Sequence, residues 1–201
     1  KEKVKPVLFI NKVDRLINEL QVTPEDMMNR FQETITKVNK LIKQFAPEEF
    51  KKEWQVSVMD GTVAFGSAYH NWGITIPYMK KSGVSMTDIF QYCNDEKQKE
   101  LAQAAPVHEV LLDMAVTKLP SPVEAQPYRI PNIWTGDLES QIGKAMMACD
   151  PEAELAMMIT KIWMDPHAGE VAVGRIYSGA ISQGESVFAI GAAKPERVQQ
   201  V

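Results

Sequence analysis

An apolar run followed at once by polar residues, at positions 7–14, constrains this chain more than any other feature. Residues 7–10 (VLFI) are wholly apolar, which is typical of a parallel strand covered on both faces. In open α/β sheets, ligands bind beyond the carboxyl ends of such strands. Asn11, Lys12, Val13 and Asp14 occupy that position. We therefore predict an α/β fold with a binding loop at residues 11–14.

Composition indicates a soluble globular protein and argues against several other classes of protein and site. A chain of 201 residues with 45% hydrophobic and 24% charged residues can bury a sizeable core as a soluble globular protein. Its formal net charge of −4 argues against attachment to nucleic acid mainly through a basic surface. Cys93 and Cys149 are far apart and belong to no Cys-x-x-Cys motif, so we predict neither a zinc site nor a disulfide framework, and a reducing cytosol. No apolar run reaches the length of a membrane span.

The segment after residue 20 predicts a long helix. Thr23 suits an N-cap, Pro24 suits the first helical position, and Pro47 would end the helix. Apolar residues recur at steps of three and four, which predicts one buried stripe: Met28, Phe31, Ile35, Val38, Ile42 and Phe45. We interpret the lysines off that stripe as a solvated face, with contact to an acidic partner or RNA as the alternative: Lys37, Lys40 and Lys43.

The remaining segments predict mixed structure. Residues 54–58 and 63–65 flank Asp60-Gly61 with alternating apolar residues, which predicts a β-hairpin. Further helices are expected from a capping box at Ser85 and from Pro106. From Pro120 to about Pro151, prolines recur with little sustained periodicity, so we expect an extended interdomain linker. Three later segments are strand-like and suggest an antiparallel barrel: residues 154–162, 170–176 and 185–190.

The residues after the first apolar strand fit the N-K-x-D guanine-specificity motif. The carboxylate of Asp14 can accept from both the ring N–H and the exocyclic amine of guanine, a pairing that adenine cannot supply. Asn11 can donate to the base and brace the loop, while the stem of Lys12 can lie along the ring face. The alternative interpretation is an ordinary polar turn between a strand and a helix, with an Asp near the helix start.

Gly66-Ser67-Ala68 follows a second expected strand that ends at Phe65. It matches the last guanine motif of GTPases, in which backbone N–H groups face the guanine carbonyl and only small side chains fit. By itself the tripeptide could be an ordinary turn. The two motifs, in order and each after a strand, predict a guanine site made of five residues: Asn11, Lys12, Asp14, Ser67 and Ala68.

No catalytic or metal-binding residue is predicted in this chain. Its three histidines show no metal-ligand spacing, and we interpret them as structural or surface residues: His70, His108 and His167.

Residues 11–16 (NKVDRL) and 65–72 (FGSAYHNW) resemble the translational GTPases of the elongation factor 2 type, particularly the archaeal branch. The two motifs are far apart in the chain, and elongation factors of this group carry an insertion between them. The resemblance places that insertion at about residues 20–60. Residues 119–122 (LPSP) resemble the end of the G domain, and residues 165–169 (DPHAG) and 174–179 (GRIYSG) resemble the opening of the second domain.

The resemblance implies a domain order. Residues 1–122 would form the C-terminal half of a P-loop GTPase domain, with a parallel sheet, helices, and an inserted helix and hairpin. Residues 123–152 would be a linker, and residues 153–201 the start of an antiparallel β-barrel.

The resemblance also implies a function: binding of GTP and GDP, and ribosomal translocation of tRNA and mRNA driven by GTP hydrolysis. The implied partners are the ribosome, including its rRNA and stalk proteins, and the tRNA–mRNA complex. The resemblance also implies that the protein is a monomer and is located in the cytoplasm. The chain has no G-x-x-x-x-G-K-[ST] loop, no D-x-x-G switch and no threonine-bearing first switch. In the family these supply the Mg²⁺ ligands and position the attacking water. We therefore do not expect this chain to hydrolyse GTP alone. Because it enters a strand pattern without an initiator Met and stops at Val201 amid an unfinished run of strands, we expect a fragment cut at both ends.

Two other functions fit the same motifs. One is a GTPase-like factor in ribonucleoprotein assembly, such as the splicing relative of elongation factor 2. The other is an interaction module in which the long helix from Pro24 and the predicted hairpin dock a partner such as an acidic ribosomal stalk.

Overall fold

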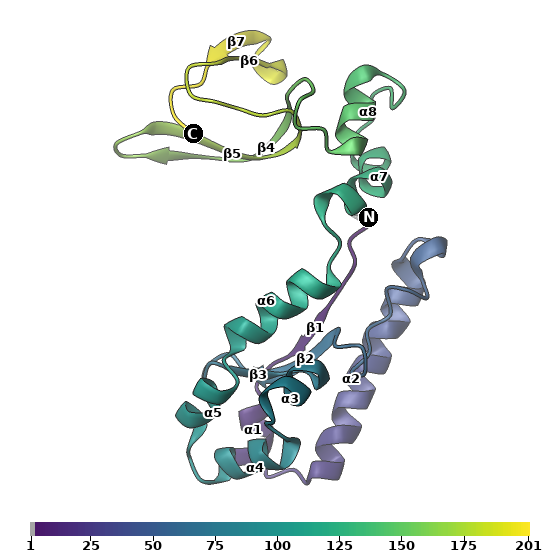
Figure 1. Cartoon of the computed structure of the whole chain (residues 1–201), viewed down its shortest axis with the longest axis vertical. Coiled ribbons are helices and arrows are strands. Elements are labelled where there is room, and N and C mark those ends of the chain that lie inside the picture. The colour runs from purple at the N-terminus through teal and green to yellow at the C-terminus, as the bar shows by residue number, and fades with distance from the viewer. Residues whose placement is uncertain (1–2) are drawn as a thin grey trace. The chain divides into compact units, whose positions relative to one another are not determined.

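Strand β1 (Leu8–Ile10) runs parallel to β2 (Val63–Ser67), and β2 pairs antiparallel with β3 (Trp72–Ile74). In this computed structural model, which describes residues 3–201, the three-stranded sheet belongs to the first of two compact units, Lys3–Leu119 (Figure 1). The second unit is Pro120–Val201. The parallel pair and its helices give the first unit the mixed α/β character expected from the sequence.

Helix α2 (Pro24–Phe45) is the long helix that the sequence predicts. The Oγ1 atom of its N-cap, Thr23, accepts a hydrogen bond of 3.1 Å from the Asp26 backbone N–H, which satisfies one of the N–H groups left free in a first turn. The predicted apolar stripe is wrong at two positions, because Met28 is 51% exposed and Phe45 is 70% exposed. The helix buries one row of side chains instead: Met27, Phe31, Ile35 and Ile42.

Helices cover both faces of the sheet. The ring of Phe31 on α2 stacks on the ring of Phe65 on β2, with centroids 4.5 Å apart. Side chains alternate along a strand, so the neighbouring Gly66 faces the other side, where a Cβ atom would lie 3.1 Å from Phe9. Helix α6 (Val107–Lys118) packs on that side against β2 and β3 (Figure 1). The sheet thus lies between α2 and α6.

The predicted hairpin at residues 54–65 is wrong. No strand forms at residues 54–58; the chain passes through a 3-10 helix (Glu48–Phe50) and turns before it enters β2. The backbone of Val56 is held by a side chain, since Asn39 of α2 donates to its carbonyl at 2.9 Å and accepts from its N–H at 2.8 Å. Because Asn39 occupies both groups, they are not available to a strand ladder, and β2 pairs with β1 instead.

Four shorter helices complete the first unit: α1 (Val13–Asn18), α3 (Ile76–Ser82), α4 (Met86–Asn94) and α5 (Gln98–Ala104). The predicted capping box of α4 is confirmed. The Asp88 N–H donates to Ser85 Oγ at 3.2 Å, and the Ser85 N–H donates to Asp88 Oδ2 at 2.7 Å. The predicted start of α6 is also confirmed, with Pro106 as its N-cap and Val110 and Met114 buried.

The prediction of an extended segment at residues 123–152 is wrong, because it contains helices α7 (Pro122–Ile133) and α8 (Gln141–Ala148). A capping box between Ser121 and Glu124 starts α7, with Pro122 at a position that needs no N–H partner. Gln126 then buries its side chain and donates to the Tyr177 carbonyl at 2.9 Å and to the Met146 carbonyl. This tertiary contact favours a helix that the proline content disfavours.

The predicted strands of the second unit are confirmed as β4 (Ala156–Asp165), β5 (Gly169–Ser178) and β6 (Ser186–Ala189). A further strand, β7 (Lys194–Arg197), pairs with β6, and β4 pairs with β5, both antiparallel. Among the described residues these two pairs form separate two-stranded sheets, so the start of a barrel stays a prediction. Within residues 3–201, no helix has the length and apolar character that crossing a membrane demands.

Candidate functional site

The parallel pairing of β1 and β2 brings the two predicted guanine motifs together. Ile10, the last residue of β1, lies opposite Phe65 on β2. Parallel strands leave a sheet at the same edge, so residues 11–14 and the end of β2 at Ser67 emerge side by side. From there the chain turns through residues 68–71 into β3.

Asn11 connects the two motifs directly. Its Oδ1 atom accepts hydrogen bonds from the Lys12 backbone N–H at 2.8 Å and from the Ala68 backbone N–H at 2.9 Å. Two N–H donors on one oxygen fix the orientation of the amide, because only the carbonyl oxygen can accept. The NH₂ group of Asn11 has no hydrogen-bond partner among residues 3–201 and remains available as a donor to a ligand.

The backbone conformation of Lys12 turns the chain from the end of β1 into helix α1, which carries Asp14. Lys12 has φ 66° and ψ 32°, a left-handed conformation that costs a non-glycine residue roughly 1 kcal/mol. The bond from its N–H to Asn11 helps to offset this cost. The turn starts α1 at Val13, which is buried, while the side chain of Lys12 stays exposed.

Asp14 is the most buried ionisable group of the candidate site. The residue is 8% exposed, and its Oδ1 atom is buried and accepts no hydrogen bond from the described residues. Its Oδ2 atom lies 3.7 Å from Nε2 of His70. A buried carboxylate oxygen without donors is costly unless a ligand supplies them. Guanine presents two adjacent N–H donor groups on one edge, so Asp14 fits this base.

Ser67 and Ala68 shape the loop that faces Asn11. Ser67 is 1% exposed, and its Oγ accepts from the His70 N–H at 3.2 Å. The Ala68 carbonyl accepts from the Asn71 N–H, and Asn71 has φ 59°. These contacts fix a tight turn with small residues toward Asn11. In this structure the Ala68 N–H, expected from the sequence to face a guanine carbonyl, donates to Asn11.

Two residues outside the five predicted site residues lie near Asp14. One is His70, interpreted above as structural or surface; its position three residues after Ser67, within the same loop, was a usable signal. The other is Cys93 on α4, which is 1% exposed. Burial, and secondarily the nearby Asp14 carboxylate, raise the pKa of the Cys93 thiol from 9.0 to about 12. No sequence signal connects Cys93 to Asp14, because only the packing of α1 against α4 brings them together.

We expect Cys93 to resist thiol reagents at pH 8, because its raised pKa leaves almost no thiolate. Cys149, which is half-buried, should react at least about a hundredfold faster. Mass spectrometry after timed alkylation would measure both rates, with the denatured chain, in which both react, as the control. Since folding keeps the thiol protonated above its ordinary pKa, the free energy of unfolding should fall as pH rises from about 9 toward 12. Equal reaction rates in the native chain would contradict this burial.

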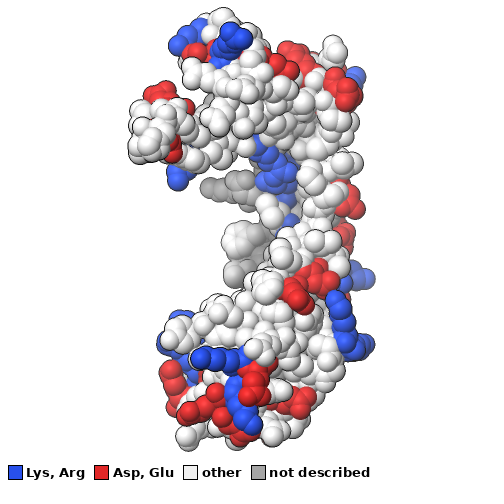
Figure 2. Space-filling model, turned by 60° about the vertical axis from the view of Figure 1, so that its left-hand side comes forward, with Lys and Arg blue, Asp and Glu red and all other residues white. Residues whose placement is uncertain are grey.

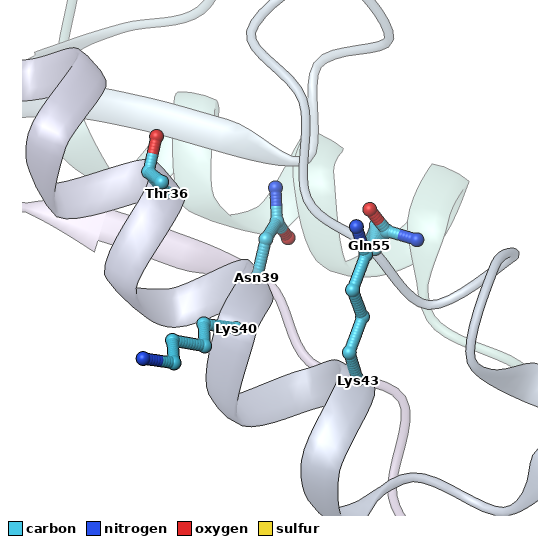
Figure 3. A pocket seen from close by; sticks show the side chains of 5 residues that line it. All are labelled: Thr36, Asn39, Lys40, Lys43 and Gln55. Carbon is cyan, nitrogen blue, oxygen red and sulfur yellow. The ribbon is translucent and has the colours of Figure 1, made fainter.

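Two hollows of the first unit lie outside the predicted guanine motifs. One of about 400 Å³ is lined by the polar side of α2 and by Gln55: Thr36, Asn39, Lys40, Lys43 and Gln55 (Figure 3). The other, of about 690 Å³, lies between the end of α1, the start of α2 and α4, where Cys93 and Phe90 line it. Neither hollow is lined by any of the five candidate site residues.

Charge on the surface is mixed in sign. Lys and Arg side chains are interspersed with Asp and Glu on the face shown in Figure 2. The three lysines off the predicted apolar stripe of α2 are exposed, which both interpretations of that face require: Lys37, Lys40 and Lys43. Within the described chain, no three His, Cys, Asp or Glu side chains are arranged to hold a metal ion.

Comparison with known proteins finds close similarity to archaeal proteins named elongation factor 2. Elongation factor 2 of Methanococcus aeolicus is 61% identical over all 201 residues, and elongation factor 2 of Methanococcus maripaludis strain C7 is 60% identical over the same length. Elongation factor 2 of Methanopyrus kandleri is also 60% identical. The chain spans 28% of the length of the two Methanococcus relatives and 16% of the Methanopyrus relative.

The profile of the family described as the elongation factor Tu GTP binding domain matches residues 1–121. This match includes all of β1, α1, β2 and the loop after it, and therefore every residue of the candidate site. The chain thus belongs to the family of proteins that carry the elongation factor Tu GTP-binding domain.

Proposed function

We propose that this chain is the guanine-recognising section of an elongation factor 2, a GTPase that moves tRNA and mRNA on the ribosome. The hydrogen bonds from Lys12 and Ala68 to Asn11 Oδ1 carry this proposal. They link two motifs that are far apart in the chain, and they leave the NH₂ group of Asn11 as a donor in the same motif as the buried carboxylate of Asp14. The three archaeal relatives named elongation factor 2 point to the same function.

Each residue of the site has a separate role in the proposal. Asp14 accepts from the ring N–H and the exocyclic amine of guanine, which adenine cannot satisfy. Asn11 donates to the base through its NH₂ group. The exposed stem of Lys12 covers one face of the ring, and the small residues Ser67 and Ala68 leave room for the carbonyl edge.

Hydrolysis requires groups outside these residues. When bound, GTP supplies the phosphates whose transfer to water drives the movement, and Mg²⁺ neutralises their charge. Neither a phosphate loop nor a switch motif occurs in residues 1–201. We propose that the complete protein provides them, that it works in the cytoplasm as a monomer, and that residues 1–201 contribute base recognition without a catalytic group.

Residues 1–122 are proposed to be the closing part of the GTP-binding domain, with an insertion at about residues 20–60. We propose that α7 and α8 connect it to a barrel that begins at about residue 153. The exposed apolar side chains of β4 agree with a barrel, since Ile159 is 52% and Ile162 63% exposed in this chain. A barrel interior would bury such side chains.

Translocation by the complete protein is the test of this function. With archaeal ribosomes that carry tRNA in the pre-translocation state, the complete protein and GTP should move the mRNA by one codon, as measured by toeprinting. ATP in place of GTP should give no movement, because adenine leaves Asp14 underpaired. GTP-dependent binding to ribosomes without mRNA movement would favour a ribonucleoprotein assembly role instead.

A further inference from the structure

The loop that holds Ser67 and Ala68 also places an imidazole against the guanine-reading carboxylate. Nε2 of His70 lies 3.7 Å from Oδ2 of Asp14. This separation is too long for a direct hydrogen bond but within the range of a charge–dipole or ion-pair attraction. Asp14 is 89% buried at its side chain, and His70 is about one-third exposed, so water screens the contact only partly.

The position of His70 is fixed by its own backbone. Its N–H donates to Ser67 Oγ at 3.2 Å, and the loop closes with Asn71 in a left-handed conformation at φ 59°. The next residue, Trp72, is fully buried and donates from Nε1 to Gln98 at 3.0 Å. The imidazole is therefore carried by a hydrogen-bonded turn, and its ring meets the ring of Tyr69 edge-on at 4.9 Å.

Asp14 needs an outside group to set its orientation. Rotation of an aspartate carboxylate about χ2 is broad, and Oδ1 of Asp14 receives no hydrogen bond from the described residues. Reading both donors of guanine requires both carboxylate oxygens in the plane of the base. A carboxylate turned out of that plane still pairs with one donor but loses the second.

We propose that His70 is a positioning residue for guanine recognition, which holds the Asp14 carboxylate at the angle that pairs with both N–H groups of the base. The inference rests on the proposed guanine site. It assigns to His70 a share of the selectivity for the exocyclic amine, although the imidazole itself does not contact the base. The group that His70 helps to recognise is the 2-amino group of a guanine nucleotide.

Inosine diphosphate separates positioning from simple support of the loop. Its base keeps the ring N–H and lacks the exocyclic amine, so it needs only one well-placed carboxylate oxygen. In the complete protein, His70→Leu should reduce the preference for GDP over inosine diphosphate about three- to tenfold, a fraction of the 1–3 kcal/mol of a bidentate base contact. His70→Gln keeps a polar N–H group of similar reach, whose dipole can attract the carboxylate at the same separation, and should retain the preference within about twofold.

Titration calorimetry of the complete protein with GDP, inosine diphosphate and ADP provides the measurement. His167→Leu, on the exposed turn between β4 and β5, is the matched control and should change none of the affinities. An equal loss of affinity for GDP and inosine diphosphate in His70→Leu would show that His70 only supports the loop, and would overturn the proposal. Unchanged affinities for both nucleotides, or a His70→Gln variant as impaired as His70→Leu, would also overturn it.

The ADP titration keeps the two proposals distinguishable. If the unaltered protein binds ADP as tightly as GDP, the guanine site itself is wrong, and the role of His70 is wrong with it. If the unaltered protein strongly prefers GDP and His70→Leu leaves the inosine ratio unchanged, only the role of His70 is wrong.

Discussion

Replacing Asp14 by asparagine in the complete protein should weaken GDP binding about 100-fold and make xanthosine diphosphate the preferred nucleotide. The amide of Asn presents one donor and one acceptor where the carboxylate presents two acceptors. It therefore sets a donor against a guanine N–H, and a mismatched pair at a dry site costs about 1–3 kcal/mol or more. Xanthine carries a carbonyl in place of the exocyclic amine, so the amide of Asn can donate to it.

Loss of folding should not explain this change. Oδ1 of Asp14 accepts no hydrogen bond from the described residues, so asparagine removes a buried charge without breaking a bond to that oxygen. The lost interaction with the first turn of α1 is worth about 0.3–1 kcal/mol. Asp113→Asn, on the exposed side of α6, is the matched control and should leave both affinities unchanged. Competition calorimetry with the two diphosphates measures the switch; an unchanged order of affinities would end the assignment of Asp14.

Trp72→Ala should lower the free energy of unfolding of the first unit by about 3–5 kcal/mol. The side chain is fully buried, and its Nε1 donates to Gln98 Oε1 at 3.0 Å. The substitution leaves a large cavity and removes a donor from the buried Gln98, and each change is destabilising. Trp72 also pairs with Ser67 across β2 and β3, so the loop of the candidate site should open more readily.

Native-state hydrogen exchange of the β2 and β3 amides measures this loss in the first unit alone. Protection of the β4 and β5 amides should stay the same, because they belong to the second unit. Tyr69→Ala provides the comparison in the same loop: Tyr69 is 86% exposed, and its loss should change stability by less than about 0.5 kcal/mol. Equal exchange in the Trp72→Ala and Tyr69→Ala variants would contradict the structural role given to Trp72.

The elements predicted correctly have local causes. The capping box at Ser85 and the Thr23-Pro24 start of α2 are satisfied by atoms within three residues, so the sequence carries the whole signal. The false hairpin and the false extended linker have the opposite origin. Asn39 takes the backbone groups of Val56, and Gln126 reaches the carbonyl of Tyr177. Contacts between residues so far apart in the chain leave no periodic pattern to read.

The candidate site also has features that follow from the sequence and features that depend on tertiary contacts. The amino-acid sequence by itself determined which side chains carry donors and acceptors suited to guanine, since those of Asn11 and Asp14 are properties of the residue types. It also determined that each motif follows a strand. Only the tertiary structure decided that the strands are parallel neighbours, that Asn11 joins the two motifs, and that His70 and Cys93 lie near Asp14. The physical reason is that each residue type has its own donors and acceptors, whereas the environment of a buried carboxylate depends on packing between distant segments.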